Sequence, residues 1–306
     1  MNFQEGTYKH FDSFKEVIKD WSLDFTILSK GDFSAYFKMA TNEKILLTRE
    51  TLNGTIEHSG VSPIGFRTLV IPVNKEVEFI WFNKKVDGNS ILVFPKNNEI
   101  DVVTFNGLDI HLISIEETFL YEIISQNSLT NCRKIFEEES LEVLLTEEFS
   151  IEFYDLANAI LNPNSSSTEK GIQETKNLIS TLLNYLESTQ VIEVKKISSK
   201  KNFALIEAVE AIQKEKEILY TIPQLCEKVG LSERSLYNAF KEKYGISPGD
   251  FIRAVRLNKA REDLYKYPEL KVSEIAGKYH FWHMGQFAKD FKKQFGVLPS
   301  EIRGRK

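Results

Sequence analysis

The first third of the chain consists of short hydrophobic runs that turn-forming residues separate. Between about residues 24 and 115, runs such as "DFTILS", "RTLVIPV" and "LDIHLISI" alternate with Lys30-Gly31-Asp32, Asn53-Gly54, Asp87-Gly88-Asn89 and Asn106-Gly107. Glycine beside Asn or Asp is typical of tight turns between strands. Many short strands at this spacing predict an antiparallel sandwich or a small barrel.

Helical periodicity precedes and follows the predicted strands. Residues 11–21 fit a short amphipathic helix, and the pattern from about 116 to 190 is helical and acidic, with a loop over 161–171. The last of these helices has a wide apolar face, formed by Ile172, Leu178, Ile179, Leu182, Leu183 and Leu186. Such a face packs either on its own domain or beside a partner copy. Its width favours the partner copy, and the sequence leaves both interpretations open.

The last hundred residues contain a weak internal repeat. "TIPQLCEKVGLSERSLYNAFKEKYGISP" (221–248) aligns with "KVSEIAGKYHFWHMGQFAKDFKKQFGVLP" (271–299) at an offset of 50 or 51 residues. Each copy has the pattern of a helix, a tight turn and a second helix, which predicts helix-turn-helix motifs over about 221–242 and 271–294. A long helix over 248–267 joins them, framed by a proline at each end.

The turn residues differ between the two copies. Gly230 suits the positive backbone φ that such a turn needs, and Ser232 is a good N-cap for the next helix. The second copy has His280 in place of the glycine, which predicts a mildly strained turn. On the joining helix, apolar residues predict the buried side, and four basic residues are expected to decorate the other side: Arg253, Arg256, Lys259 and Arg261.

Charge divides the chain into an acidic front and a basic back. The net charge is −5, but residues from Lys200 onward contain 21 Lys and Arg against 14 Asp and Glu, a balance of +7 that leaves −12 for residues 1–199. A basic segment fits nucleic acid or a membrane surface. A hydrophobic content of 42% excludes wholesale disorder. Without an apolar run of about 20 residues, a signal-peptide core or a disulfide framework, a reduced cytoplasm is the expected location.

Specific motifs in the helical part resemble the AraC/XylS family of transcriptional regulators. They are the pattern from Gly230 to Leu236, the Ala260-Arg261 pair, and "FKKQFGVLPS" at 291–300. More narrowly, "FWHMGQFAKDF" is similar to regulators of the ethanolamine-utilisation type. The resemblance implies an α+β chain in which a β-rich, cupin-like sensor precedes an all-α DNA-binding domain. It also implies a cytoplasmic, often dimeric, ligand-modulated DNA binder that is most often an activator and acts with RNA polymerase.

The expected domains and contacts follow from the resemblance. Residues 1–192 are the expected sensor and dimerisation domain, 193–201 a linker and 202–306 the DNA-binding domain. In the first motif, the expected DNA contacts are Ser232, Arg234, Ser235, Tyr237, Asn238 and Lys241. In the second motif they are His283, Met284, Gly285, Gln286, Lys289 and Lys292. Arg and Asn suit guanine and adenine edges, Gln286 suits adenine, and the lysines suit phosphate.

Other classes of site lack a matching pattern. The five histidines form no ligand cluster and no CxxC occurs, so neither a metal nor a cofactor is expected. No phosphate loop, GxGxxG or GxSxG is present, so an enzyme is not expected. The effector is unknown, and a pocket lined by Arg49, His58, Phe66 and Trp81 is one candidate site for it. The alternatives are a ligand-independent regulator, a repressor, a β-barrel enzyme, and a protein adaptor with a basic helical tail.

Overall fold

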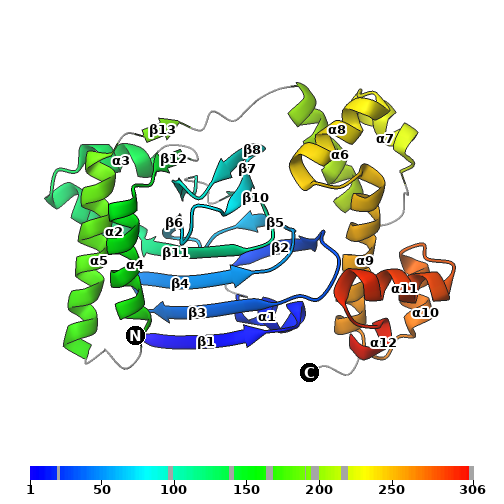
Figure 1. The fold of residues 1–306 in the computed structure, drawn as a ribbon, viewed down its shortest axis with the longest axis horizontal. Helices are drawn as coiled ribbons and strands as arrows, with labels where there is room; N and C mark the ends of the chain where they lie inside the picture. The colour runs from blue at the N-terminus through cyan, green and yellow to red at the C-terminus, as the bar shows by residue number, and fades with distance from the viewer. Residues whose placement is uncertain are drawn as a thin grey trace.

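The protein forms four layers, in the order helices, sheet, sheet, helices. The computed structural model describes residues 1–18, 21–95, 99–137, 141–162, 168–189, 191–193, 200–214 and 220–302. In Figure 1, the helices that follow the strands lie on one side of the two sheets, and the C-terminal helices lie on the other side. The sheets pack face to face without closing into a barrel, so of the two predicted β architectures the chain adopts the sandwich.

All strand pairs are antiparallel. The larger sheet has the order β1 (Asn2–Tyr8), β3 (Ala35–Thr41), β4 (Ile45–Leu52), β11 (Leu108–Glu116), β6 (Phe66–Pro72), β9 (Ser90–Val93), β12 (Leu141–Leu144) and β13 (Val191–Glu193). The smaller sheet has the order β2 (Ser22–Ile27), β5 (Ile56–Val61), β10 (Glu99–Thr104), β7 (Glu78–Trp81) and β8 (Lys84–Asp87).

The strands extend beyond the predicted limits of about 24 and 115. β1 is an edge strand whose side chains are mostly exposed, so its sequence lacks the alternation that marks a half-buried strand. β12 and β13 lie in the region predicted to be helical, where each adds only a few residues to one end of the larger sheet.

Helices cover the outer face of the larger sheet. They are α2 (Glu117–Gln126), α3 (Thr130–Glu137), α4 (Glu147–Leu161) and α5 (Thr168–Ser188), while α1 (Phe11–Val17) follows the first strand. On α5, Leu178, Ile179, Leu182, Leu183 and Leu186 are each at most 2% exposed and pack into the core beneath these helices. Only Ile172 of the predicted apolar face is exposed. The domain's own core therefore accounts for the wide apolar face, which no longer argues for a partner copy.

The C-terminal part is all-helical, as predicted, with two helix-turn-helix motifs and a joining helix. Its elements are α6 (Lys200–Lys214), α7 (Ile222–Val229), α8 (Glu233–Tyr244), α9 (Pro248–Lys266), α10 (Val272–Lys278), α11 (Met284–Phe295) and α12 (Pro299–Ile302). Of the predicted linker 193–201, residue 193 ends β13 and residue 200 begins α6, while 194–199 lie outside the described residues.

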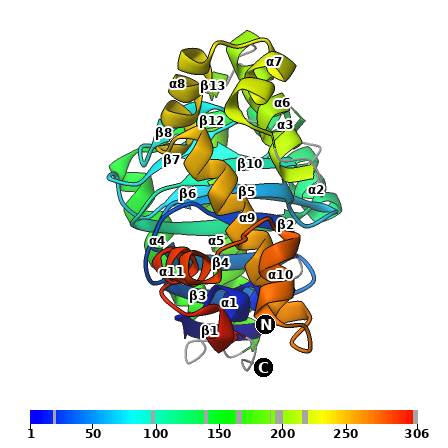
Figure 2. The same cartoon turned by 90° about the vertical axis from the view of Figure 1, so that its right-hand side faces the viewer.

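The C-terminal helices pack on the outer face of the smaller sheet. Figure 2 shows α9 running across this face. Leu28, Ile80 and Val103 of the sandwich share one buried cluster with residues of α6, α7, α8 and α9. The two parts of the chain therefore share a hydrophobic core, which favours one fixed arrangement over two independently tumbling domains.

Candidate nucleic-acid interface

The first motif has the geometry that its sequence predicts. Gly230 ends α7 with a φ of 66°, and its N–H donates to the carbonyl of Cys226. Ser232 then caps α8, because its Oγ accepts from the backbone N of Ser235 at 3.2 Å and lies 2.9 Å from that residue's Oγ. Ser232 and Ser235 therefore hold the start of the helix in the DNA-free chain.

The second helix of the first motif, α8, has distinct buried and exposed faces. Leu236, Ala239 and Phe240 are buried. The remaining predicted contacts are exposed: Arg234, Tyr237, Asn238 and Lys241. Lys241 Nζ donates to the carbonyl of Gly245 at 3.2 Å, where a cation complements the negative end of the helix dipole. Four of the six predicted side chains thus form one solvent-facing strip on α8, whereas the two serines serve its cap.

The turn of the second motif has the backbone strain that its sequence predicts. His280 has a φ of 61°, the left-handed region that Gly230 occupies in the first motif. Arg256 of α9 holds this turn, with Nε donating to the carbonyl of Tyr279 at 2.8 Å and Nη2 to that of His280 at 2.6 Å. Arg256 is half-buried and stacks 4.6 Å from the ring centre of Phe281. The prediction that Arg256 merely decorates the helix is therefore wrong.

The second helix of the second motif, α11, buries Phe287, Phe291 and Phe295 against the core. All six predicted contacts are exposed: His283, Met284, Gly285, Gln286, Lys289 and Lys292. The exposure of His283 disfavours a role for its ring in packing against the core. Neighbouring Trp282 is 73% exposed, so the recognition end of the motif also presents an aromatic ring.

The Asp290 carboxylate contacts two polar side chains on the exposed face of α11. Gln286 Nε2 donates to Asp290 Oδ1 at 2.8 Å, and Asp290 Oδ2 lies 3.3 Å from Nη1 of Arg253. The amide that suits an adenine edge is therefore held along the helix surface by a residue one turn away. Sequence reasoning did not include Asp290, because an acidic residue on a presumed DNA-facing helix gives no positive signal for DNA contact.

Other residues of the same helices bind the sandwich, and we call this contact the interdomain interface. At its α8 end, Lys243 is 6% exposed and its Nζ lies 2.9 and 3.0 Å from the carboxylate oxygens of Asp101 on β10. Glu57 on β5 accepts from Tyr244 Oη at 3.3 Å and from Gln213 Nε2 at 3.0 Å. Burial raises the pKa of Glu57 to about 7.

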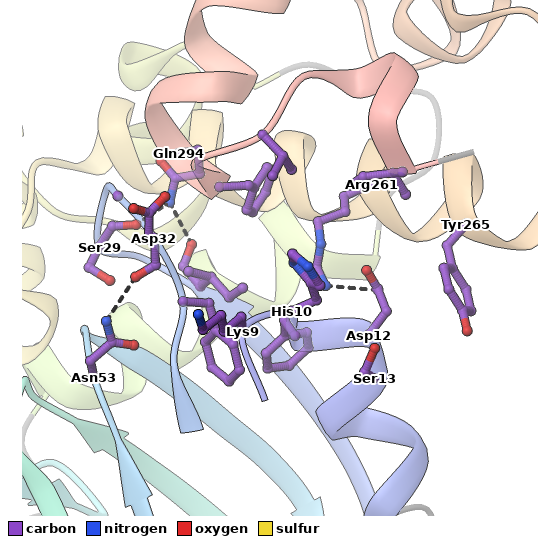
Figure 3. Close-up of a pocket in the computed structure, with 17 residues that line it drawn as sticks. Lys9, His10, Asp12, Ser13, Ser29, Asp32, Asn53, Arg261, Tyr265 and Gln294 are labelled. Carbon is purple, nitrogen blue, oxygen red and sulfur yellow. Dashed lines mark hydrogen bonds and ion pairs between the residues drawn. The ribbon is translucent and has the colours of Figure 1, made fainter. Parts of the chain in front are cut away.

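At its other end the interdomain interface is built on α9 and α11. Figure 3 shows Arg261 and Asp12 pointing toward each other, with Arg261 Nη2 2.8 Å from Asp12 Oδ1. Gln294 Nε2 donates at 2.8 Å to the carbonyls of both Ile27 and Ser29. Arg261 is 5% exposed, so it does not decorate the surface as predicted. The sequence hides this role because a polar residue on a helix ordinarily indicates solvent.

A cavity of about 70 Å³ lies between the two sheets, and we call it the sheet cavity. Of the predicted pocket residues, His58 and Trp81 line it. Phe66 does not line it, and Arg49 points to the opposite face of β4, where it pairs with Asp109 at 3.0 Å. The prediction missed Glu50, the next residue along β4, because successive side chains of a strand alternate between faces. The lining residues are Ile18, Trp21, Leu23, Phe25, Phe37, Thr48, Glu50, His58, Val70, Phe79, Trp81, Leu92, Phe94, Ile100, Val102, Thr104, Leu108, Ile110 and Leu112.

The described ranges contain neither a metal-binding cluster nor a membrane-spanning helix. No group of three or more His, Cys, Asp or Glu side chains is placed to hold a metal ion there. No described helix combines the length and apolar character that a bilayer crossing needs.

Comparisons with known proteins match the helical part. Residues 225–305 fit a family model described as a helix-turn-helix domain. The chain is 36% identical over 96 residues to the probable thc operon regulatory protein of Rhodococcus erythropolis, covering 31% of this chain and 29% of that protein. It is 34% identical over 110 residues to the XylDLEGF operon transcriptional activator of Pseudomonas putida, covering 35% of this chain and 34% of the activator.

A solved structure described as the AraC-like transcriptional activator CuxR is also similar, with 11% identity and a TM-score of 0.44 over 85% of this chain and 96% of its own. The present chain spans about a third of the length of the curated relatives it matches. These relatives are named as regulators and not as enzymes, in agreement with the expectation from the sequence. The helical part of this chain therefore contains a helix-turn-helix domain and is similar to the corresponding part of these transcriptional regulators.

Proposed function

We propose that the whole chain is a sequence-specific regulator of transcription, an activator whose N-terminal sandwich senses a small molecule. The observation that carries this proposal is that the buried and the exposed faces of α8 and α11 have different roles. Their buried faces form the core and the interdomain interface. Ten of the twelve predicted DNA contacts are exposed on these helices or at their starts, and the other two, Ser232 and Ser235, form the cap of α8. Joined by α9, the two helices suit successive major grooves, which are about 34 Å apart.

The proposal includes partners and a location. An activator acts beside RNA polymerase, and bacterial regulators of this class work in the cytoplasm, often as homodimers. The resemblance of "FWHMGQFAKDF" to regulators of the ethanolamine-utilisation type belongs to this proposal as well, and it does not set the effector. Support for a homodimer comes from the family resemblance alone, because α5 uses its apolar face within its own domain.

DNA binding by the full chain tests the proposal. Fluorescence anisotropy with duplexes from the region upstream of its own gene, at 50 and 200 mM salt, is compared with a scrambled duplex of equal length. A specific regulator binds one upstream fragment at least about 10³-fold more tightly than the scrambled duplex, and both affinities fall with salt. Equal affinity for every duplex would support a protein adaptor with a basic tail. A footprint on the bound fragment then gives the number and spacing of the sites.

A further inference from the structure

Trp282 has the most exposed ring among the phenylalanine, tyrosine and tryptophan side chains that the structure describes. It is 73% exposed, whereas Phe203 is 62% and Tyr237 is 47% exposed. The other two tryptophans belong to the N-terminal part, where Trp81 is fully buried and Trp21 is half-buried. A single exposed apolar side chain is common on protein surfaces, so its position in the fold decides what it indicates.

Trp282 lies at the start of α11. It stands between His280, the turn residue with positive φ, and Met284, the first residue of the helix. The second helix of a helix-turn-helix motif contacts base edges with its N-terminal residues. Four of the six predicted contacts of this motif follow Trp282 directly, at 283–286, and Met284 among them is 37% exposed. The ring is therefore placed at the end of the helix that enters the groove.

The turn holds Trp282 in a fixed position. Phe281, its neighbour in the chain, packs against the core, with its ring centre 5.0 Å from that of Phe287. Arg256 bonds the two carbonyl groups that precede Phe281 and stacks on its ring. The His280 ring meets the Trp282 ring edge-on, with 6.0 Å between ring centres. Because the backbone and the ring are already supported, binding through Trp282 costs little conformational entropy.

The chemistry of the indole ring narrows its partner on DNA. The ring has no charge, so it does not neutralise a phosphate group. The major groove presents hydrogen-bonding groups and one apolar group, the C5-methyl of thymine, which packs on apolar side chains. The C-terminal part, with a net charge of +7 from Lys200 onward, complements DNA around such a contact. An exposed aromatic ring at the start of α11 therefore matches a thymine methyl.

We propose that Trp282 is a specificity-determining residue that packs on the C5-methyl of a thymine at one end of the sequence that α11 contacts. This inference rests on the proposed DNA binding and goes beyond it, because the twelve predicted contacts do not include Trp282. Apolar packing by Trp282 adds a second kind of base recognition to hydrogen bonding by Gln286. A cytosine or a deoxyuridine at this position lacks the methyl group that the ring contacts.

Replacement of thymine by deoxyuridine tests the contact, because it removes the methyl group and leaves base pairing unchanged. The probe is the upstream fragment that the full chain binds most tightly, with each thymine of its footprint replaced singly. Fluorescence anisotropy of the labelled duplexes gives the affinities. At one thymine of each bound site we expect binding to weaken at least about threefold, as for the loss of one buried methyl group.

Two substitutions assign the methyl contact to its residue. Trp282→Ala should weaken binding to the thymine fragment at least about fivefold, and it should bind the thymine and the deoxyuridine fragments equally. Trp282→Phe keeps an aromatic ring and should keep most of the preference for thymine. Phe203→Ala is the matched control, because Phe203 is an exposed aromatic residue on α6, outside both motifs, and its loss should leave both affinities unchanged.

Acrylamide quenching of tryptophan fluorescence shows whether DNA covers the ring. Of the three tryptophans, Trp282 is by far the most exposed, so the quenching that Trp282→Phe abolishes belongs to it. This part of the quenching should fall at least about threefold when the parent chain binds the fragment. Because it is measured on the parent chain with its own tryptophan, a folding defect in Trp282→Ala does not affect the result.

A deoxyuridine penalty that disappears in Trp282→Ala, together with protection from acrylamide, supports the inference. No penalty at any thymine overturns it, and a penalty that persists in Trp282→Ala overturns it by assigning the methyl to another residue such as Met284. Equal losses on thymine, deoxyuridine and scrambled duplexes overturn it in favour of a backbone contact. A ring that stays open to acrylamide in the complex also overturns it and leaves Trp282 free for a protein partner. If no fragment is bound specifically, the proposed function fails, and this inference fails with it.

Discussion

Glu57 and His58 are consecutive residues of β5, yet they serve opposite sides of the smaller sheet. The Glu57 carboxylate accepts a hydrogen bond from Tyr244 of α8, whereas the His58 ring lies beside Thr104 in the sheet cavity. A strand that is buried on both faces transmits displacement from one face to the other, because its backbone is common to both. This arrangement gives the chain a physical link between the sheet cavity and the helix-turn-helix domain.

The ion pair of Lys243 and Asp101 should hold the interdomain interface together. Lys243→Met leaves the Asp101 carboxylate without its partner at a mostly buried contact, so we expect the free energy of unfolding to fall by about 2 kcal/mol. Urea denaturation of the single variants and of Lys243→Met with Asp101→Asn measures the coupling, expected at 1 kcal/mol or more.

The control for this cycle is Lys241→Met on the same helix. Lys241 is exposed and bonds only within its own helix end, so its loss should change stability by at most about 0.5 kcal/mol. If the two lysine variants lost equal stability, or if the double variant were simply additive, the ion pair would not be what fixes the interface.

Glu50 should make stability depend on pH in a defined window. Burial raises its pKa from 4.5 to about 7, so between these pH values the folded chain holds a proton that the unfolded chain has released. Stability therefore falls as the pH rises from about 4.5 to about 7, by up to roughly 3 kcal/mol from this group. Below 4.5 and above 7 this contribution is constant.

Glu50→Gln removes this pH window, so its stability relative to the parent chain should be higher at pH 8 than at pH 4.5. Urea denaturation of both chains at pH 4.5, 6 and 8 measures the difference, which cancels the similar contribution of Glu57. Parallel stability curves for the two chains would mean that the carboxyl ionises normally, for example because water reaches it in the cavity.

Much of the fold follows from local patterns in the sequence. The helix-turn-helix pairs were predictable because Gly230 needs its positive φ, Ser232 caps the next helix, and phenylalanines recur on the buried face of α11. These are short-range effects that a few neighbouring residues determine. The antiparallel strands were likewise predictable from turn residues and from the alternation of apolar and polar side chains. β1 was not predicted, because an exposed edge strand has no buried face and so lacks this alternation.

The interdomain interface and part of the cavity lining were not predictable. Arg261, Asn258 and Gln294 look like solvent-facing residues on their own helices. Only the packing of α1 and β2, which are distant in the sequence, makes them partners of Asp12 and Ile27. Within β4, choosing Arg49 over Glu50 as the inward residue was a shift of one position. Strand alternation makes such a shift exchange the two faces.

Two glycines of the helix-turn-helix motifs, one at a turn and one inside a helix, should respond in opposite ways to substitution by alanine. At Gly230 an added methyl group meets no atom within 4 Å, but the φ of 66° disfavours it, so Gly230→Ala should cost about 1 to 2 kcal/mol. Gly277 also has free space and lies inside α10 without a positive φ, so Gly277→Ala should gain about 0.5 to 1 kcal/mol. The melting temperatures of the two variants are compared with that of the parent chain, and they should shift in opposite directions. Equal shifts would mean that packing, and not backbone conformation, determines the effect.

The exposed residues of α11 should divide between base reading and phosphate binding. Gln286→Ala should reduce discrimination at one base pair by about 1 to 3 kcal/mol while leaving binding to a scrambled duplex unchanged. Lys289→Ala should weaken binding to all duplexes alike and reduce the slope of log affinity against log salt by about one. Anisotropy titrations on a set of single-base variants at several salt concentrations measure both effects.

Lys278→Ala provides the control in the same domain. Because Lys278 already pairs with Asp263 on the joining helix, this substitution should leave the slope of log affinity against log salt unchanged. Asp290→Ala extends the test, because Asp290 holds the Gln286 amide in the DNA-free chain and adds a negative charge to the face that meets phosphate. Its removal should tighten binding to every duplex while the base preference set by Gln286 persists. An unchanged base preference in Gln286→Ala would instead assign Gln286 to the support of Asp290 and Arg253, and would move the reading of sequence to other residues of the helix.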